Sequence, residues 1–121
     1  MVWPPSTHQD VQDAVTGLQT PTKRTITGNY TLVAADASGI VLHSTAATPV
    51  TITLPQDSAA TIAVESAIPW RQYGAGTVTF AAGTGATLVS RGSAATSAGP
   101  YAEGMATKVA ANTWLLSGDI A

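Results

Sequence analysis

Hydrophobic and polar positions follow different patterns in the two parts of this chain. In residues 1–24 the apolar side chains recur at the spacing of one helix face, and they are Val11, Ala14, Val15 and Leu18. Pro4 and Pro5 favour an extended lead before this stripe, and Pro21 ends the helical pattern. The sequence therefore predicts an N-terminal arm, residues 1–24, that contains a short amphipathic helix.

The predicted helix needs a surface that covers its apolar stripe. A helix of about a dozen residues is only marginally stable in isolation. The apolar stripe could pack either on the remainder of its own chain or on a neighbouring chain. In the second case the arm docks on a partner, and Trp3 in the extended lead is its anchor.

From Thr25 onward the period changes to two, which is typical of strands with one buried face. Residues 50–54 alternate strictly and stop at Pro55. Comparable short runs, separated by turn residues, are 30–33, 40–43, 67–72, 77–80 and 87–89, followed by a hairpin of 105–109 with 113–116. Residues 91–104 predict a long loop. We expect residues 25–121 to form a mainly β domain, an antiparallel β-sandwich or a barrel-like fold.

Few side chains carry a charge, which changes the expected character of the surface. Charged residues make up 10% of the 121 residues, against about 25% in typical domains. A weakly charged monomer is poorly protected against association, so we expect much of the surface to be covered in the working state. This favours a protein that assembles with copies of itself or with other chains.

The distribution of the charges argues against two kinds of partner. The formal net charge is −2, and of the five cations only Lys23 and Arg24 are adjacent, so no basic stripe is present for nucleic acid. No apolar run approaches the ~20 residues of a membrane span. We therefore expect neither nucleic acid nor a membrane as a partner.

Residue types used in catalysis and metal binding occur without the spacing that their chemistry requires. Neither His8 nor His43 has a carboxylate or a second histidine at ligand spacing. Glu65 and Glu103 are better explained as exposed loop residues than as the paired acids of a glycosidase. The chain also contains no cysteine. We expect no enzymatic activity, no cofactor and no metal ion.

The aromatic residues separate into core candidates and interface candidates. Those within strand patterns are expected in the core, and they are Tyr30, Phe80 and Trp114. Trp3 and Trp70 differ from these, because Trp3 precedes the helix in an extended segment and Trp70 follows a proline and lies beside Arg71. Because Trp and Arg are enriched at interface hot spots, the candidate partner-binding residues are Trp3, Trp70, Arg71 and the four residues of the helix stripe. The alternative for both tryptophans is the edge of their own core.

The strand region also contains an ordered series of short segments. They are Tyr30-Thr31-Leu32, Asp36, and the runs from Pro49 to Pro55, from Arg71 to Phe80 and from Lys108 to Asp119. This series resembles a β-rich module of virion proteins in tailed bacteriophages, which occurs in tail fibres, minor tail proteins and small head decoration proteins. The resemblance covers about residues 25–121. Pro69 departs from it and predicts an edge strand or a bulge.

This resemblance implies a structural role in a virus particle. We expect a capsid decoration or cement protein, a minor capsid protein that binds the head lattice and stabilises it. Its partners would be the major capsid protein or other virion proteins, and a homo-oligomer, with a trimer favoured, is also implied. Such a protein is made in the host cytoplasm and lies on the capsid surface of the virion. The alternative is a tail-fibre or minor tail component with a receptor-facing role.

Overall fold

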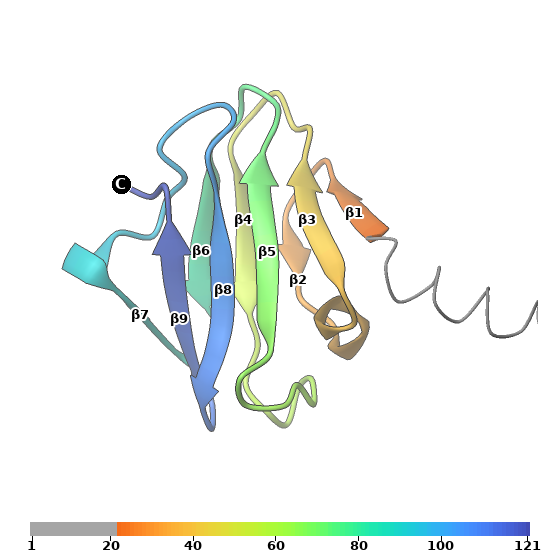
Figure 1. Ribbon diagram of the computed structural model, residues 1–121, viewed down its shortest axis with the longest axis vertical. Coiled ribbons are helices and arrows are strands. Elements are labelled where there is room, and N and C mark those ends of the chain that lie inside the picture. The colour runs from red at the N-terminus through yellow and green to blue at the C-terminus, as the bar shows by residue number, and fades with distance from the viewer. Residues whose placement is uncertain (1–21) are drawn as a thin grey trace, which may run out of the picture.

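Residues 22–121, the part of the chain that the structure describes, form two β-sheets in a computed structural model (Figure 1). The larger sheet has six strands in the order β1 (Thr22–Ile26), β3 (Ile40–Ser44), β5 (Ala67–Gln72), β8 (Glu103–Ala110), β9 (Thr113–Gly118) and β7 (Thr87–Ser90). The smaller sheet has three, in the order β2 (Tyr30–Thr31), β4 (Val50–Leu54) and β6 (Val78–Ala82). Two short 3₁₀ turns are η1 (Ala34–Ala37) and η2 (Arg91–Ser93). The predicted mainly β class is confirmed.

The boundary of the β region lies slightly earlier than the sequence pattern predicts. Strand β1 begins at Thr22, so residues 22–24 belong to the larger sheet and not to an N-terminal arm. The predicted amphipathic helix, with Trp3 ahead of it, lies outside the described residues. Its docking surface therefore stays a prediction.

Three successive rungs build the two sheets, and each rung gives one strand to each sheet. The rungs are β1 with β2, β3 with β4, and β5 with β6, and their strands stack in parallel in a solenoid-like arrangement. The predicted antiparallel sandwich or barrel is therefore wrong. Among the named strands of the described region, only the pairs β5–β8 and β8–β9 are antiparallel. A period of two reveals that one face of a strand is buried, but not the direction of the neighbouring strand.

The corners between the sheets stack closely, and glycine makes this possible at two positions. In the corner after β5, the backbone N–H of Gly74 donates to the oxygen of Ser44 and that of Gly76 to the oxygen of Ala46. A Cβ atom on either glycine would collide with backbone atoms of the corner below, at Ala46 and Thr48 respectively. The third rung can therefore lie directly on the second.

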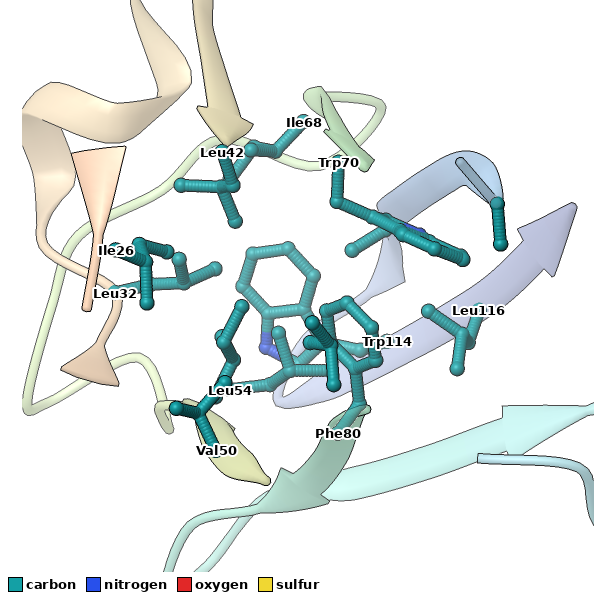
Figure 2. Packing of buried hydrophobic residues seen from close by; sticks show 14 of the residues in the cluster. Ile26, Leu32, Leu42, Val50, Leu54, Ile68, Trp70, Phe80, Trp114 and Leu116 are labelled. Carbon is teal, nitrogen blue, oxygen red and sulfur yellow. The ribbon is translucent and has the colours of Figure 1, made fainter. Parts of the chain in front are cut away.

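The side chains that point inward from the two sheets form one core (Figure 2). The rings of Trp70 and Phe80, from opposite sheets, lie 5.1 Å apart between centroids. Trp114 is fully buried, and its indole Nε1 donates to the backbone oxygen of Pro55 at 3.0 Å. The core positions predicted for Phe80 and Trp114 are confirmed, and Tyr30 packs against the same cluster while partly buried.

One end of the stack is closed by the segment that the sequence predicted as a long loop. Residues 95–97 run along the edge of β6, where Phe80 donates its backbone N–H to Ala95 and Ser97 donates to Val78, each at 2.8 Å. The C-terminal residue Ala121 in turn donates to Thr96 at 2.8 Å. This edge of the smaller sheet is therefore covered by backbone pairing.

Pro69 lies in β5, which is an interior strand of the larger sheet, so the predicted edge strand or bulge is wrong. The ladder from β3 to β5 begins at Trp70, one residue beyond the proline. On the other side Pro69 lies opposite Met105 in an antiparallel ladder. Alternate pairs of such a ladder exchange no backbone hydrogen bonds, and a residue without an N–H fits at those positions.

Candidate functional site

The outward side of the larger sheet carries an unusual run of apolar side chains over its C-terminal half. Val89 of β7, Met105 of β8 and Leu115 of β9 are 41%, 42% and 37% exposed. Val89 lies beside Leu115, and Met105 lies beside Pro69. Leu115 is paired with Thr107, two residues from Met105, so the two side chains are diagonal neighbours on one face. We call these four residues, Pro69, Val89, Met105 and Leu115, the apolar face.

This apolar face departs from the usual solvated side of a sheet. Strands with one face in water normally alternate between apolar residues inside and polar residues outside. Strands β7 and β9 contain no charged residue at all. Contiguous exposed apolar surface is typical of sites where proteins contact one another, so the face is a candidate surface for assembly.

A pocket of about 290 Å³ opens beside the apolar face. It is lined by His43, Arg71, Gln72, Tyr73, Tyr101 and Glu103. The strand registers explain why three of these meet: His43 of β3 lies beside Arg71 of β5, and Arg71 lies beside Glu103 of β8. The pocket is therefore a row across three neighbouring strands, completed by two tyrosines from the adjoining loops. We call it the tyrosine pocket.

A short hydrogen bond fixes the protonation of the histidine in this row. The Nε of Arg71 donates to Nδ1 of His43 at 2.6 Å. An arginine is always protonated and can only donate, so His43 accepts as a neutral imidazole that carries its proton on Nε2. Burial lowers the pKa of His43, and the positive charges of Arg71 and Lys23 lower it further. At neutral pH the arginine is therefore held by an uncharged ring.

The two tyrosines form the exposed wall of the pocket. Tyr73 and Tyr101 are 57% and 72% exposed, and their rings meet edge to face with centroids 5.7 Å apart. The ring of Tyr73 also contacts His43, at 5.0 Å between centroids. These contacts cover only part of the two rings, so exposed π surface remains accessible to a ligand.

Backbone bonds hold both tyrosines in place. The N–H of Tyr73 donates to the oxygen of Ser44 at 2.8 Å, and that of Tyr101 donates to the oxygen of Gln72 at 2.5 Å. The backbone N–H of Gln72 in turn donates to the oxygen of Ala102 at 2.9 Å. Tyr101 has a φ of 70°, a left-handed conformation that is uncommon outside glycine. Such strain persists only where the surroundings hold it, and it clusters at functional sites.

Two opposite charges lie beside each other in the pocket without pairing. Arg71 and Glu103 are direct neighbours on β5 and β8. Within residues 22–121 the ion pairs are Arg24 with Asp36 and Lys108 with Asp57, and neither includes the pocket residues. Apart from the bond from Arg71 Nε to His43, no side-chain bond within residues 22–121 engages the guanidinium of Arg71 or the carboxylate of Glu103.

Asp36 belongs to a second polar cluster, and its bonds stabilise the first rung. Its carboxylate accepts from Arg24 Nε at 2.6 Å, from the Tyr30 hydroxyl at 2.6 Å and from the backbone N–H of Val33 at 2.9 Å. Burial raises the pKa of Tyr30 to about 12, with the Asp36 hydrogen bond as the second cause. Because every oxygen of Asp36 is already bonded within the fold, this cluster is structural.

Lys108 forms a third cluster under the loop between β4 and β5. Its buried Nζ donates to the backbone oxygen of Ile62 at 2.7 Å and forms an ion pair with Asp57. Asn112 binds the same loop from the β8–β9 turn, since its Oδ1 accepts from the backbone N–H of Asp57 at 2.7 Å. These contacts fasten the loop to the hairpin.

The residues that the sequence predicts as a partner-binding group do not form one group in the structure. Trp70 is 1% exposed and packs in the core, so its predicted direct contact with a partner is wrong. The reason is the alternation of the strand, which sends Trp70 inward and its neighbour Arg71 outward to the pocket. Trp3 and the helix stripe, Val11, Ala14, Val15 and Leu18, lie outside the described residues.

Sequence reasoning missed most of the tyrosine pocket. The sequence pattern places Tyr73 among the turn residues between the predicted strands 67–72 and 77–80, and Glu103 in the predicted loop 91–104. One signal was present, because Arg71 and Tyr73 are two residues apart and so share a face of an extended segment. His43 and Arg71 are 28 residues apart in sequence, and only the stacking of the rungs brings them together.

Comparisons with protein families, with curated proteins and with solved structures give no significant match to this chain. Within residues 22–121, no group of three metal-ligating side chains gathers. A search of the same residues finds no helix with the length and apolar character needed to cross a membrane.

Proposed function

We propose that this chain is a structural protein of a virus particle, a decoration or cement protein that attaches to the head lattice and stabilises it. The observation that supports attachment is the apolar face, where Val89, Met105 and Leu115 are exposed together on one side of the larger sheet. Burying such side chains against a partner is favourable by about 25 cal/mol per Å² of apolar area. The partner is the major capsid protein or another virion protein.

The geometry favours attachment over a sheet face rather than through charge. Strands β5, β8 and β9 below the apolar face are held on both sides by backbone ladders, and the edge strand β7 is paired with β9, so the surface is largely rigid before it binds. Rigid surfaces lose little entropy on association. Several copies joined as a trimer, the oligomer that the resemblance implies, would add avidity and slow release.

The attribution to a virus particle rests on a different observation. It is supported by the ordered series of strand segments that resembles the β-rich module of tailed-phage virion proteins. The apolar face supports contact with a protein partner, but it does not distinguish a virus particle from any other assembly.

A tail-fibre or minor tail component with a receptor-facing role is the second candidate. The tyrosine pocket favours it, because Tyr73 and Tyr101 are exposed and held rigidly beside the charges of Arg71 and Glu103. A protein that only cements a lattice has no need of such a pocket. The number of copies per particle separates the two candidates, since decoration requires many copies over the head and a tail component only a few.

The test of attachment mixes particles that lack this protein with wild type and with Met105→Asp/Leu115→Asp. We expect the variant to sediment with the particles at least about tenfold more weakly, which corresponds to a loss of 1.4 kcal/mol. Ser58→Asp/Thr61→Asp adds the same charge at exposed positions of the loop between β4 and β5 and should bind like wild type. Equal binding of all three proteins would exclude the apolar face, and failure of wild type to bind heads would exclude decoration.

A further inference from the structure

We propose that the tyrosine pocket binds one neutral pyranose unit of a carbohydrate. This inference goes beyond attachment to a particle, and it stands on the pocket alone. The residues that carry it are Arg71, Tyr73, Tyr101 and Glu103, which line one hollow at the end of β5.

The exposed rings match the apolar side of a sugar. Tyr73 and Tyr101 both line the hollow and meet edge to face at an interplanar angle of 79°, so the ring that presents its edge keeps both π faces uncovered by the other ring. The face of an aromatic ring carries partial negative charge and attracts the C–H groups on one side of a pyranose. A flat, uncharged ring with C–H groups on its side is thus a suitable occupant.

The charged groups match hydroxyl groups and favour neither sign of charge in a ligand. Arg71 can only donate hydrogen bonds, and the carboxylate of Glu103 can only accept them. A hydroxyl does both, so two adjacent hydroxyls can accept from Arg71 and donate to Glu103. An ion of either sign would be attracted by one of these residues and repelled by the other, because Arg71 and Glu103 are neighbours on β5 and β8, so neither sign of charge is favoured.

The size and rigidity of the hollow also fit one sugar ring. A volume of about 290 Å³ lies just below the range of about 300–1,000 Å³ for small-molecule sites, which suits a single ring and not a larger ligand. His43 holds Arg71 through its Nδ1, and Tyr101 is held by its backbone bond to Gln72. Little ordering remains to be done on binding, which favours affinity for a small ligand.

The experiment is an NMR titration of the isolated full-length chain. The probes are the methyl glycosides of glucose, galactose, mannose and N-acetylglucosamine, with glucuronic acid as an acidic probe and glycine as a zwitterion. We expect at least one neutral glycoside to shift the ring signals of Tyr73 and Tyr101 in a saturable way. The two charged probes should leave these signals unchanged.

Variants then assign the site. Tyr101→Ala and Arg71→Gln should each weaken the Kd about tenfold or more, whereas Tyr101→Phe, which keeps the ring, should retain binding. Val64→Ala removes part of an exposed apolar side chain elsewhere on the surface and should bind like wild type. Glu103→Gln provides a second polar variant if Arg71→Gln fails to fold.

Three results would overturn the proposal: no neutral glycoside binds, a charged probe binds in its place, or Tyr101→Ala and Arg71→Gln bind as wild type does. The outcome is independent of the attachment test. Met105→Asp/Leu115→Asp should keep its affinity for the sugar while losing its affinity for particles.

Discussion

Arg71 and His43 share a hydrogen bond of 2.6 Å in which the cation donates and the imidazole accepts. This bond can exist only while Nδ1 of His43 is unprotonated. A buried imidazole thus positions an arginine whose guanidinium reaches the tyrosine pocket. Protonation of His43 removes the acceptor and places two cations side by side.

The free energy of unfolding should therefore depend on pH in the range where His43 titrates, which lies below pH 6.5. Burial and the nearby cations lower the pKa of His43 in the folded state below the ordinary 6.5. As the pH falls below 6.5 the unfolded chain takes up this proton first, so the free energy of unfolding decreases until the folded pKa is passed. Urea unfolding across this range measures the effect.

The control for the pH window is His43→Asn, whose side-chain oxygen can still accept from Arg71 but does not titrate. This variant should lose the part of the slope that belongs to His43. A slope that is the same in wild type and in His43→Asn would contradict the assignment.

Trp114→Ala should destabilise the fold by about 3–5 kcal/mol, the usual cost of removing a large buried aromatic side chain. The indole is fully buried and its Nε1 bonds to Pro55. Trp114→Phe keeps much of the packing and loses the hydrogen bond, so it should cost less. Chemical denaturation of both variants provides the measurement, and an unchanged midpoint for Trp114→Ala would place this residue outside the core.

Gly76→Ala and Gly28→Ala form a matched pair that tests the stacked corners. A Cβ on Gly76 collides with backbone atoms of Thr48, whereas a Cβ on Gly28 meets nothing within 4 Å. We expect Gly76→Ala to lower the free energy of unfolding by about 1–3 kcal/mol, as overpacking does. Gly28→Ala should be nearly neutral. Equal thermal midpoints for the two variants would show that the corners are not in close contact.

Removal of the carboxylate of Asp57 should destabilise the protein more than removal of the whole ion pair. Lys108 is buried, so Asp57→Ala leaves its charge without a counter-ion. The double variant Asp57→Ala/Lys108→Met removes both charges and should recover part of the loss. Thermal unfolding of the single and double variants compares them, and a double variant less stable than Asp57→Ala would contradict this account.

The same ion pair predicts a sensitivity to acid. The hydrogen bond from Lys108 lowers the pKa of Asp57 below its ordinary 3.8, with the backbone N–H of Asn112 adding to the effect. The stability that this carboxylate contributes is present above pH 3.8 and is lost as the pH falls through the folded pKa. The slope of stability in acid should be smaller in the double variant.

The positions of the strands could be predicted from the sequence, whereas their pairing could not. The strict alternation of Val50–Leu54 and the turn at Asn112 each report on a few neighbouring residues, and the structure confirms both the strand and the hairpin. Parallel stacking depends on contacts between corners such as Gly76 and Thr48, which are 28 positions apart in sequence. No local pattern contains that information.

The tyrosine pocket was hidden for the same reason. In the sequence, Arg71 is a candidate because it follows Trp70, but the alternation of β5 sends the tryptophan into the core and leaves the arginine beside His43. Tyr101 and Glu103 reach the pocket because β8 pairs with β5. The lining residues come from three strands and two loops, and only the register of the sheet shows that they meet.

The stacking of parallel rungs also sets an order of folding. The hairpin of β8 and β9 is the one pair of neighbouring named strands in the described region that a short turn connects, so it is the nucleus that costs least loop entropy. The ladder between β3 and β5 joins residues such as Leu42 and Trp70, which are far apart in sequence, and can form only after longer loops close. We expect the chain to fold slowly for its size, with β5 adding to the hairpin first, β3 next and β1 last.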